Sequence, residues 1–139
     1  MREKYRIDET ILVIGHVGKF VEQKNHMFLI DIFKKIVQKN SRVKLMLVGD
    51  GMMRNKIEEK INTEGLESQV ILCGMQDNIS RFLSVMDIIV FPSLWEGLPL
   101  SLLESQANGV PCVASDVITS EVNMGGAADF IIKGCLFMG

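Results

Sequence analysis

Residues 87–116 read DIIVFPSLWEGLPLSLLESQANGVPCVASD, and this stretch decides the fold. It begins with the apolar run 88–91, which has the composition of a buried strand. A helix follows, with Pro99 near its first turn and Gly109 just past its end, where these two residue types favour helix boundaries. A second apolar strand covers residues 110–114. The order strand, helix, strand is typical of a parallel β-sheet covered by helices.

The same alternation runs through the chain upstream of this stretch. Apolar strands are predicted at residues 11–15, 43–48 and 70–73, and residues 130–132 can supply a sixth strand. Helical spacing separates the strands, and from residue 25 onward one helix face carries Phe28, Leu29, Ile32, Phe33, Ile36 and Val37. We expect His26, at the start of this helix, to be exposed. The predicted fold class is α/β, a doubly wound Rossmann-like parallel sheet with helices on both faces.

Length and composition indicate one globular domain. The chain has 139 residues, 47% hydrophobic and 23% charged, with a net charge of −2, so it lacks the basic surface that nucleic-acid binding requires. Residues 1–10 are charged and irregular and are predicted to be an arm or linker; residues 11–139 form the domain. Three cysteines without Cys-x-x-Cys spacing indicate reduced thiols, and no apolar run reaches the roughly 18 residues that span a bilayer. These features predict a cytoplasmic protein.

The first loop of the predicted sheet has a composition suited to phosphate. Gly15 and Gly18 are expected to end the first strand, and Lys19 and Lys24 follow them. In a parallel sheet, ligands bind beyond the carboxyl ends of the strands. Mobile positive charge beside a helix amino terminus suits a diphosphate, although solvated surface lysines would leave the same pattern.

The loop and helix within residues 87–116 carry two carboxylates, Glu96 and Glu104. The backbone between them opens a helix whose positive end can face an anion. A carboxylate repels a diphosphate, so Glu104 suits a neutral polyol such as a ribose diol, and Glu96 can reach a sugar hydroxyl. Two other interpretations stay open: a solvated loop residue with a helix-favouring surface residue, or an acid/base pair whose spacing the sequence does not give.

The other polar residues give weaker evidence for a functional site. His16 follows the first strand and is interpreted as structural, with substrate contact as the alternative. Asp50 and Asp116 stand at strand ends, where a carboxylate can hold a metal or a ribose, but neither has a cluster of ligands around it, so no metal site is predicted. A basic group is either a solvated helix face or a surface attracted to anionic membrane; it comprises Lys34, Lys35, Lys39, Arg42 and Lys44.

Four segments in order resemble the carboxy-terminal half of retaining glycosyltransferases of group 1, also called family 4. They are GKFVEQKNHMFLIDIF (18–33), LMLVGDG (45–51), VILCG (70–74) and the stretch 87–116. The resemblance covers residues 11 to about 132 and is closest to members that build bacterial capsular or exopolysaccharides. It implies two Rossmann-like domains facing across a cleft, with the nucleotide-sugar donor held by the carboxy-terminal one.

The resemblance also implies roles for single residues. Glu96 would face the donor sugar as the catalytic residue, Glu104 would bind the ribose, and Lys24 would neutralise the diphosphate. Lys19 stands where the family usually has arginine, so a bidentate fork becomes a point charge. The resemblance implies that Gly18 also binds the donor and that Gly74 and Met75 contact its nucleobase. It further implies contacts to the sugar and phosphate from Gly97, Leu98, Pro99, Leu100 and Ser101.

For the whole enzyme, the resemblance implies transfer of a hexose from a nucleoside diphosphate sugar to a saccharide or lipid-linked acceptor. It implies no cofactor and no essential bound metal, and a location in the cytoplasm or at the inner face of the membrane, with peripheral membrane association. We expect the chain to lack the amino-terminal acceptor domain and the final helices of the family, and therefore to be inactive alone. The alternatives are a nucleotide-sugar epimerase of related fold and a non-enzymatic nucleotide-binding fragment.

Overall fold

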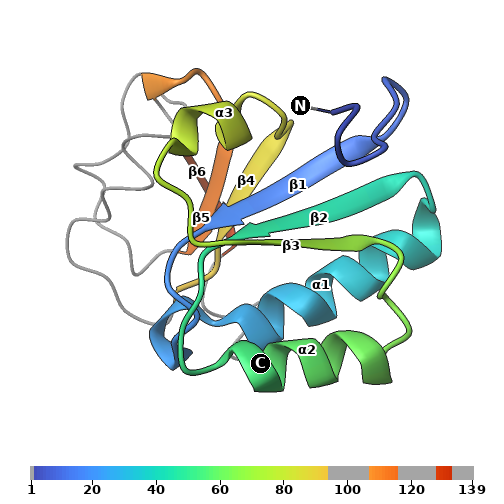
Figure 1. The fold of residues 1–139 in the computed structure, drawn as a ribbon, viewed down its shortest axis with the longest axis vertical. Coiled ribbons are helices and arrows are strands. Elements are labelled where there is room, and N and C mark those ends of the chain that lie inside the picture. The colour runs from blue at the N-terminus through green and yellow to red at the C-terminus, as the bar shows by residue number, and fades with distance from the viewer. Residues whose placement is uncertain (1, 94–106, 116–127, 133–139) are drawn as a thin grey trace.

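A computed structural model describes residues 2–93, 107–115 and 128–132 of the chain (Figure 1). Six strands of this part form one sheet in the order β3-β2-β1-β4-β5-β6, and all neighbouring strands are parallel. The strands are β1 (Leu12–Val17), β2 (Val43–Val48), β3 (Val70–Gly74), β4 (Ile88–Phe91), β5 (Cys112–Ser115) and β6 (Ala128–Ile132). This order is that of a doubly wound Rossmann-like sheet, which confirms the predicted fold class.

Helices cover both faces of the sheet. Helices α1 (His26–Lys39) and α2 (Arg54–Thr63) lie on one face and the short α3 (Ile79–Leu83) on the other, and the turn η1 (Glu22–Lys24) precedes α1 (Figure 1). Each face has its own buried cluster, with Phe33 of α1 in one and Phe82 of α3 in the other. The chain changes direction across the sheet between β1 and β4, so the ligand crevice of this topology lies at their carboxyl ends.

Strand β1 extends further than the glycines predicted. Gly15 lies inside the strand opposite Met46 of β2, and the turn comes only at Gly18. A Cβ at residue 15 would lie 2.0 Å from the sulfur of Met86, so this glycine makes room for a side chain rather than for a turn. The prediction that Gly15 ends the strand was therefore wrong.

The expected exposure of His26 was also wrong. His26 is 3% exposed, and it shares the buried face of α1 with Leu29, Ile30 and Phe33. These positions follow the i, i+3, i+4, i+7 spacing of a core-facing stripe, which begins at the first residue of the helix. Of the predicted apolar face, Phe28 and Ile32 are only half-buried.

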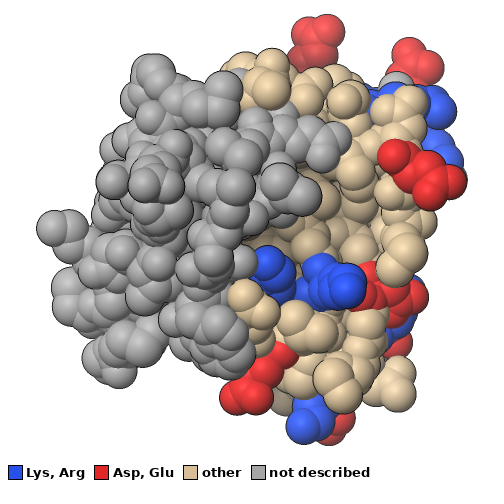
Figure 2. All heavy atoms as spheres, turned by 90° about the vertical axis from the view of Figure 1, so that its left-hand side faces the viewer, with Lys and Arg blue, Asp and Glu red and all other residues tan. Residues whose placement is uncertain are grey.

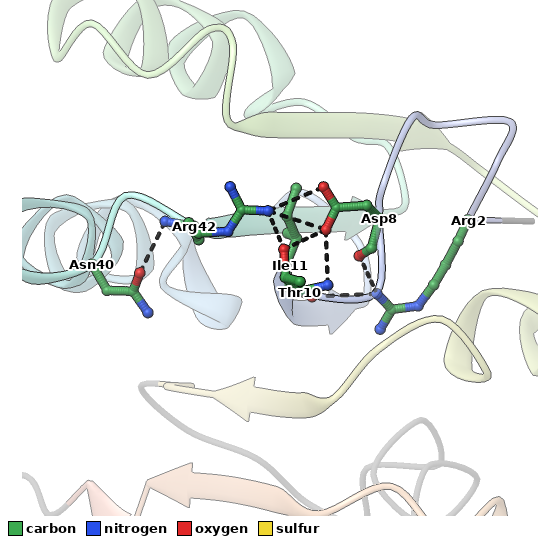
Figure 3. Close-up of polar contacts among 6 residues, drawn as sticks. All are labelled: Arg2, Asp8, Thr10, Ile11, Asn40 and Arg42. Carbon is green, nitrogen blue, oxygen red and sulfur yellow. Dashed lines mark hydrogen bonds and ion pairs between the residues drawn. The ribbon is translucent and has the colours of Figure 1, made fainter.

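Residues 2–10, predicted as an arm or linker, fold against the amino end of the sheet. The Arg2 guanidinium donates to the Asp8 carbonyl, and the Asp8 carboxylate pairs with Arg42 at 3.1 Å (Figure 3). Arg2 also forms an ion pair with Asp87 at 3.1 Å. The Asp87 carboxylate also accepts the N–H of Val13 in β1, at 2.7 Å. These bonds fix the segment at the amino ends of the strands, the end of the sheet opposite the ligand crevice.

Candidate functional site

A pocket of about 150 Å³ opens at the carboxyl ends of β1, β2 and β3. It brings together three of the predicted donor-binding residues, Gly18, Lys19 and Met75. Figure 2 looks at the carboxyl-end side of the molecule and shows lysine and arginine atoms near the centre of this face. The pocket is lined by Val17, Gly18, Lys19, Val48, Gly49, Asp50, Met75, Gln76 and Ile79.

Backbone hydrogen bonds tie together the three loops that form this pocket. Gly18 donates its N–H to Val48 at 3.0 Å, and Gly49 donates its N–H to Gly74 at 2.8 Å. Gly49 has a φ of +142°, and a Cβ there would lie 2.0 Å from the carbonyl oxygen of Gly18. The predicted residue Gly74 thus lies beside the pocket and supports it through its carbonyl group.

The two lysines of the first loop differ in how they are held. The Lys19 side chain is exposed, and in the part of the chain that the structure describes it forms no hydrogen bond or ion pair. Lys24 lies in η1 and is half-buried, with its Cε 3.6 Å from the place a Cβ on Gly18 would take. Both ammonium groups therefore come from the loop that carries Gly18, as the sequence predicts.

The end of β4 is joined to this first loop. Asn25, between η1 and α1, has a φ of +62° and donates its side-chain amide to the carbonyl of Pro92 at 2.9 Å. Ser93 follows Pro92 and is fully buried. The predicted residues beyond it lie outside the described part of the chain: Glu96, Gly97, Leu98, Pro99, Leu100, Ser101 and Glu104.

Most polar groups in the pocket already have partners. Asp50 accepts the N–H of Gly51 at 2.8 Å and pairs with Arg54 at 3.2 Å, and the Gln76 amide donates to Cys73 at 2.6 Å. Met75, by contrast, is 73% exposed and presents an apolar surface. The pocket thus offers the charge of Lys19 and an apolar wall, a combination that suits a ligand with both a phosphate and a flat ring.

The pocket is small for a whole nucleotide. Ligand sites usually enclose about 300–1,000 Å³, so 150 Å³ receives only part of such a ligand. Sequence reasoning gave Gln76 no role, and it considered Asp50 as a ligand for a metal or a ribose and decided against it. Asp50 directly follows Gly49, and Gln76 lies two residues after Gly74. That position, at the carboxyl end of a parallel strand, was the available signal.

Two histidines lie buried next to the lysine loop. His16 is fully buried and His26 nearly so, and within the described part of the chain neither Nδ1 nor Nε2 of either ring has a hydrogen-bond partner. Burial lowers the pKa of His26 to about 4, helped by the positive charge of Lys24. The pKa of His16 is lowered well below its ordinary value, first by burial and then by His26 and Lys24. Both rings are therefore neutral near pH 7.

Other candidate sites receive little support from the described residues. No group of three or more His, Cys, Asp or Glu lies together there as a metal site. In the basic group, Lys34 pairs with Glu64 and the Lys44 ammonium donates to the carbonyl of Ser68 at 3.3 Å. No described helix has the length and apolar character needed to cross a membrane.

The model of the family described as "Glycosyl transferases group 1" matches residues 11–136. The chain is 42% identical over 114 residues to the putative glycosyltransferase EpsF of Bacillus subtilis, covering 82% of this chain and 30% of that protein. It is 35% identical over 108 residues to an Escherichia coli enzyme named UDP-Gal:alpha-D-GlcNAc-diphosphoundecaprenol alpha-1,3-galactosyltransferase, covering 76% and 28%. The chain thus spans less than a third of the length of either relative.

A solved structure shares the fold and part of the sequence. It is a mutant of TarM from S. aureus in complex with fondaparinux, alpha-GlcNAc-glycerol and UDP. The TM-score is 0.75 at 30% identity, over 78% of this chain and 22% of that one.

Proposed function

Because the chain belongs to the family of group 1 glycosyl transferases, we propose that it is the donor-binding domain of a retaining glycosyltransferase. The complete enzyme moves a hexose from a nucleoside diphosphate sugar to a saccharide or lipid-linked acceptor. Its product contributes to a bacterial surface polysaccharide, in keeping with relatives such as the capsular polysaccharide glycosyltransferase CapM of Staphylococcus aureus.

The observation that carries this proposal is the pocket at the carboxyl ends of β1, β2 and β3. Its wall holds Gly18, Lys19 and Met75, and Lys24 lies on the same loop. The lysines offset the charge of a diphosphate, the Gly18 backbone lets it approach closely, and the apolar Met75 packs against the nucleobase. Two phosphates need two cations in reach, and this loop supplies them.

The carboxylates complete the proposed site by family resemblance. Glu104 binds the ribose hydroxyls and Glu96 faces the donor sugar, while the backbone of residues 97–101 contacts the sugar and phosphate. The leaving diphosphate is stabilised by charge from Lys19 and Lys24. The carboxylates in this scheme hold the donor, and neither is assigned an acid/base step.

The chain corresponds to only part of the relatives it matches, so acceptor binding is assigned to another part of the enzyme. We therefore propose that the 139-residue chain binds donor nucleotide and does not transfer sugar by itself. A transfer assay with UDP-glucose and UDP-galactose and a saccharide acceptor checks this. Sugar transfer by the isolated chain would contradict it.

Calorimetric titration with uridine diphosphate (UDP) and guanosine diphosphate tests the donor site. We expect the wild-type chain to bind one of them, and Lys24→Ala and Glu104→Ala to weaken that binding about tenfold or more, because each removes a charge or a pair of acceptors from the ligand. Lys35→Ala is the matched control, since Lys35 is exposed on α1 away from the pocket. Equal affinity in all four proteins would overturn the residue assignments, and no binding by the wild type would overturn the proposed function.

A further inference from the structure

Four buried rings form a continuous row beneath the lysine loop. The ring centroids of Phe20 and His26 are 4.7 Å apart, those of His26 and His16 4.6 Å, and those of His16 and Phe91 5.4 Å. All four residues are at most 3% exposed, and the ring planes meet at 53° to 74°, as aromatic pairs prefer. We call this row the ring chain (Phe20, His26, His16 and Phe91).

The ring chain joins segments that are distant in the sequence. Phe20 belongs to the loop after β1, His26 is the first residue of α1, His16 lies in β1, and Phe91 ends β4. The loop with both lysines is thereby packed against the carboxyl end of β4. The hydrogen bond from Asn25 to the carbonyl of Pro92 makes a second link between the same two segments.

His16, inside the ring chain, lies close to Gly18 of the proposed diphosphate loop. The His16 Cε1 lies 3.2 Å, and the Lys24 Cε 3.6 Å, from the point that a Cβ on Gly18 would occupy. The imidazole and the lysine stem therefore both lie on the side of Gly18 where a side chain would otherwise stand. A displacement of the His16 ring would leave both the Gly18 backbone and the Lys24 stem without this support.

The way the histidine rings are held indicates what they contribute. Among the residues that the structure describes, none of their four nitrogens has a hydrogen-bond partner, so the rings act through their shape and their aromatic edges. Buried polar groups are nearly always hydrogen-bonded, which makes two adjacent exceptions unusual for ordinary core packing. The charged group that acts on both rings is Lys24, and a protonated imidazole would repel its ammonium group.

We propose that His16 and His26 are positioning residues for the donor diphosphate: as neutral aromatic rings they hold Lys24 and the Gly18 backbone in place relative to the end of β4. This inference rests on the proposed function, because it concerns the same diphosphate. The two histidines do not touch the ligand. They fix the distance between the cations of the first loop and the end of β4.

The experiment measures the UDP affinity and the unfolding temperature of the 139-residue chain at pH 7.5. It compares variants that keep an aromatic ring at each histidine position with variants that remove the ring. His16→Ala and His26→Ala are expected to weaken UDP binding about tenfold, while His16→Phe and His26→Phe, which keep the ring, stay within about threefold of wild type. Phe33→Leu is the matched control. Phe33 is buried on the same face of α1 as His26, two turns further along the helix. Its change is therefore expected to lower the unfolding temperature and to leave UDP affinity unchanged.

The outcomes separate this inference from the proposed function. Alanine variants that remain folded and bind UDP like wild type would overturn the positioning role, and so would phenylalanine variants as weak as the alanine ones, since the nitrogens would then matter. If Phe33→Leu also weakens binding tenfold, affinity follows overall stability and the inference fails. A wild-type chain that binds neither UDP nor guanosine diphosphate would instead overturn the proposed function.

Discussion

Gly49 and Gly18 meet so closely that a Cβ on Gly49 would lie 2.0 Å from the carbonyl oxygen of Gly18. The contact is between backbones of two loops, at the carboxyl ends of β1 and β2, and both glycines line the proposed donor pocket. Only a residue without a side chain allows this approach. The pocket's shape therefore depends on a steric relationship between two loops some thirty residues apart in the sequence.

Gly49→Ala is expected to destabilise the protein by about 3 kcal/mol, because it adds a clash with backbone to a strained φ of +142°. Urea unfolding measures the change. Gly65→Ala is the control for strain alone, since Gly65 has a φ of +70° with nothing within 4 Å of its Cβ position; about 1 kcal/mol is expected there. Equal losses at the two positions would contradict the predicted clash.

Lys19→Arg is expected to tighten UDP binding about fivefold. An arginine fork can form two parallel bonds to a phosphate where the lysine offers a single point charge, and Lys19 has no competing ion pair within the described residues. Calorimetric titration at fixed ionic strength measures the gain. Lys35→Arg on the exposed side of α1 should leave the affinity unchanged, and a similar gain there would contradict a specific contact between Lys19 and the phosphate.

Acid is expected to destabilise the protein between pH 6.5 and about 4. The pKa of His26 is 6.5 in the unfolded chain and about 4 when folded, lowered by burial and then by Lys24. As pH falls through this window, the unfolded chain gains a proton that the folded one does not, so stability is lost, by roughly 3 kcal/mol for His26 at pH 4.5. Above pH 6.5 this contribution does not vary.

Urea unfolding at pH 7 and pH 4.5 checks the acid sensitivity in wild type and in His26→Phe, which has no proton to gain. The difference in unfolding free energy between the two pH values should be smaller in the variant. If both proteins lose the same stability, His26 does not have the lowered pKa.

Asp87→Leu is expected to cost about 1–3 kcal/mol of unfolding free energy. The Asp87 carboxylate accepts the N–H of Val13 at 2.7 Å, and its loss leaves this partly buried donor unpaired. Arg2→Ala is the comparison; it removes the Arg2 ion pair but keeps the bond to Val13, and it should cost less than 1 kcal/mol for a partly exposed pair. A larger loss for Arg2→Ala would show that its bonds to the backbone dominate.

The order of elements and the edge of the sheet at which the pocket opens could be predicted from local patterns. Apolar runs predicted β2 and β4 at their observed bounds, and glycines at strand ends marked the loops that now form the pocket. These features follow from residues close together in the chain, and the rule that ligands bind at carboxyl ends of parallel strands then gives the edge. The lysine loop was predicted in this way.

Features that depend on distant partners could not be read from the pattern. From sequence, Gly15 has the character of a turn residue, but in the fold its missing side chain makes room for Met86. His26 has the character of an exposed helix start, but in the fold the rings of His16 and Phe20 pack against it. In both cases the deciding neighbour lies on another element.

The sequence by itself determined the α/β alternation, the family resemblance and the two lysines suited to a diphosphate, since each depends on residue type and spacing. The tertiary structure decided which glycines serve turns and which serve close approach. It also decided that two histidines stay neutral in the core beneath Lys24. The physical reason is that burial, steric contact and pKa depend on neighbours in space, and only the folded sheet brings those neighbours together.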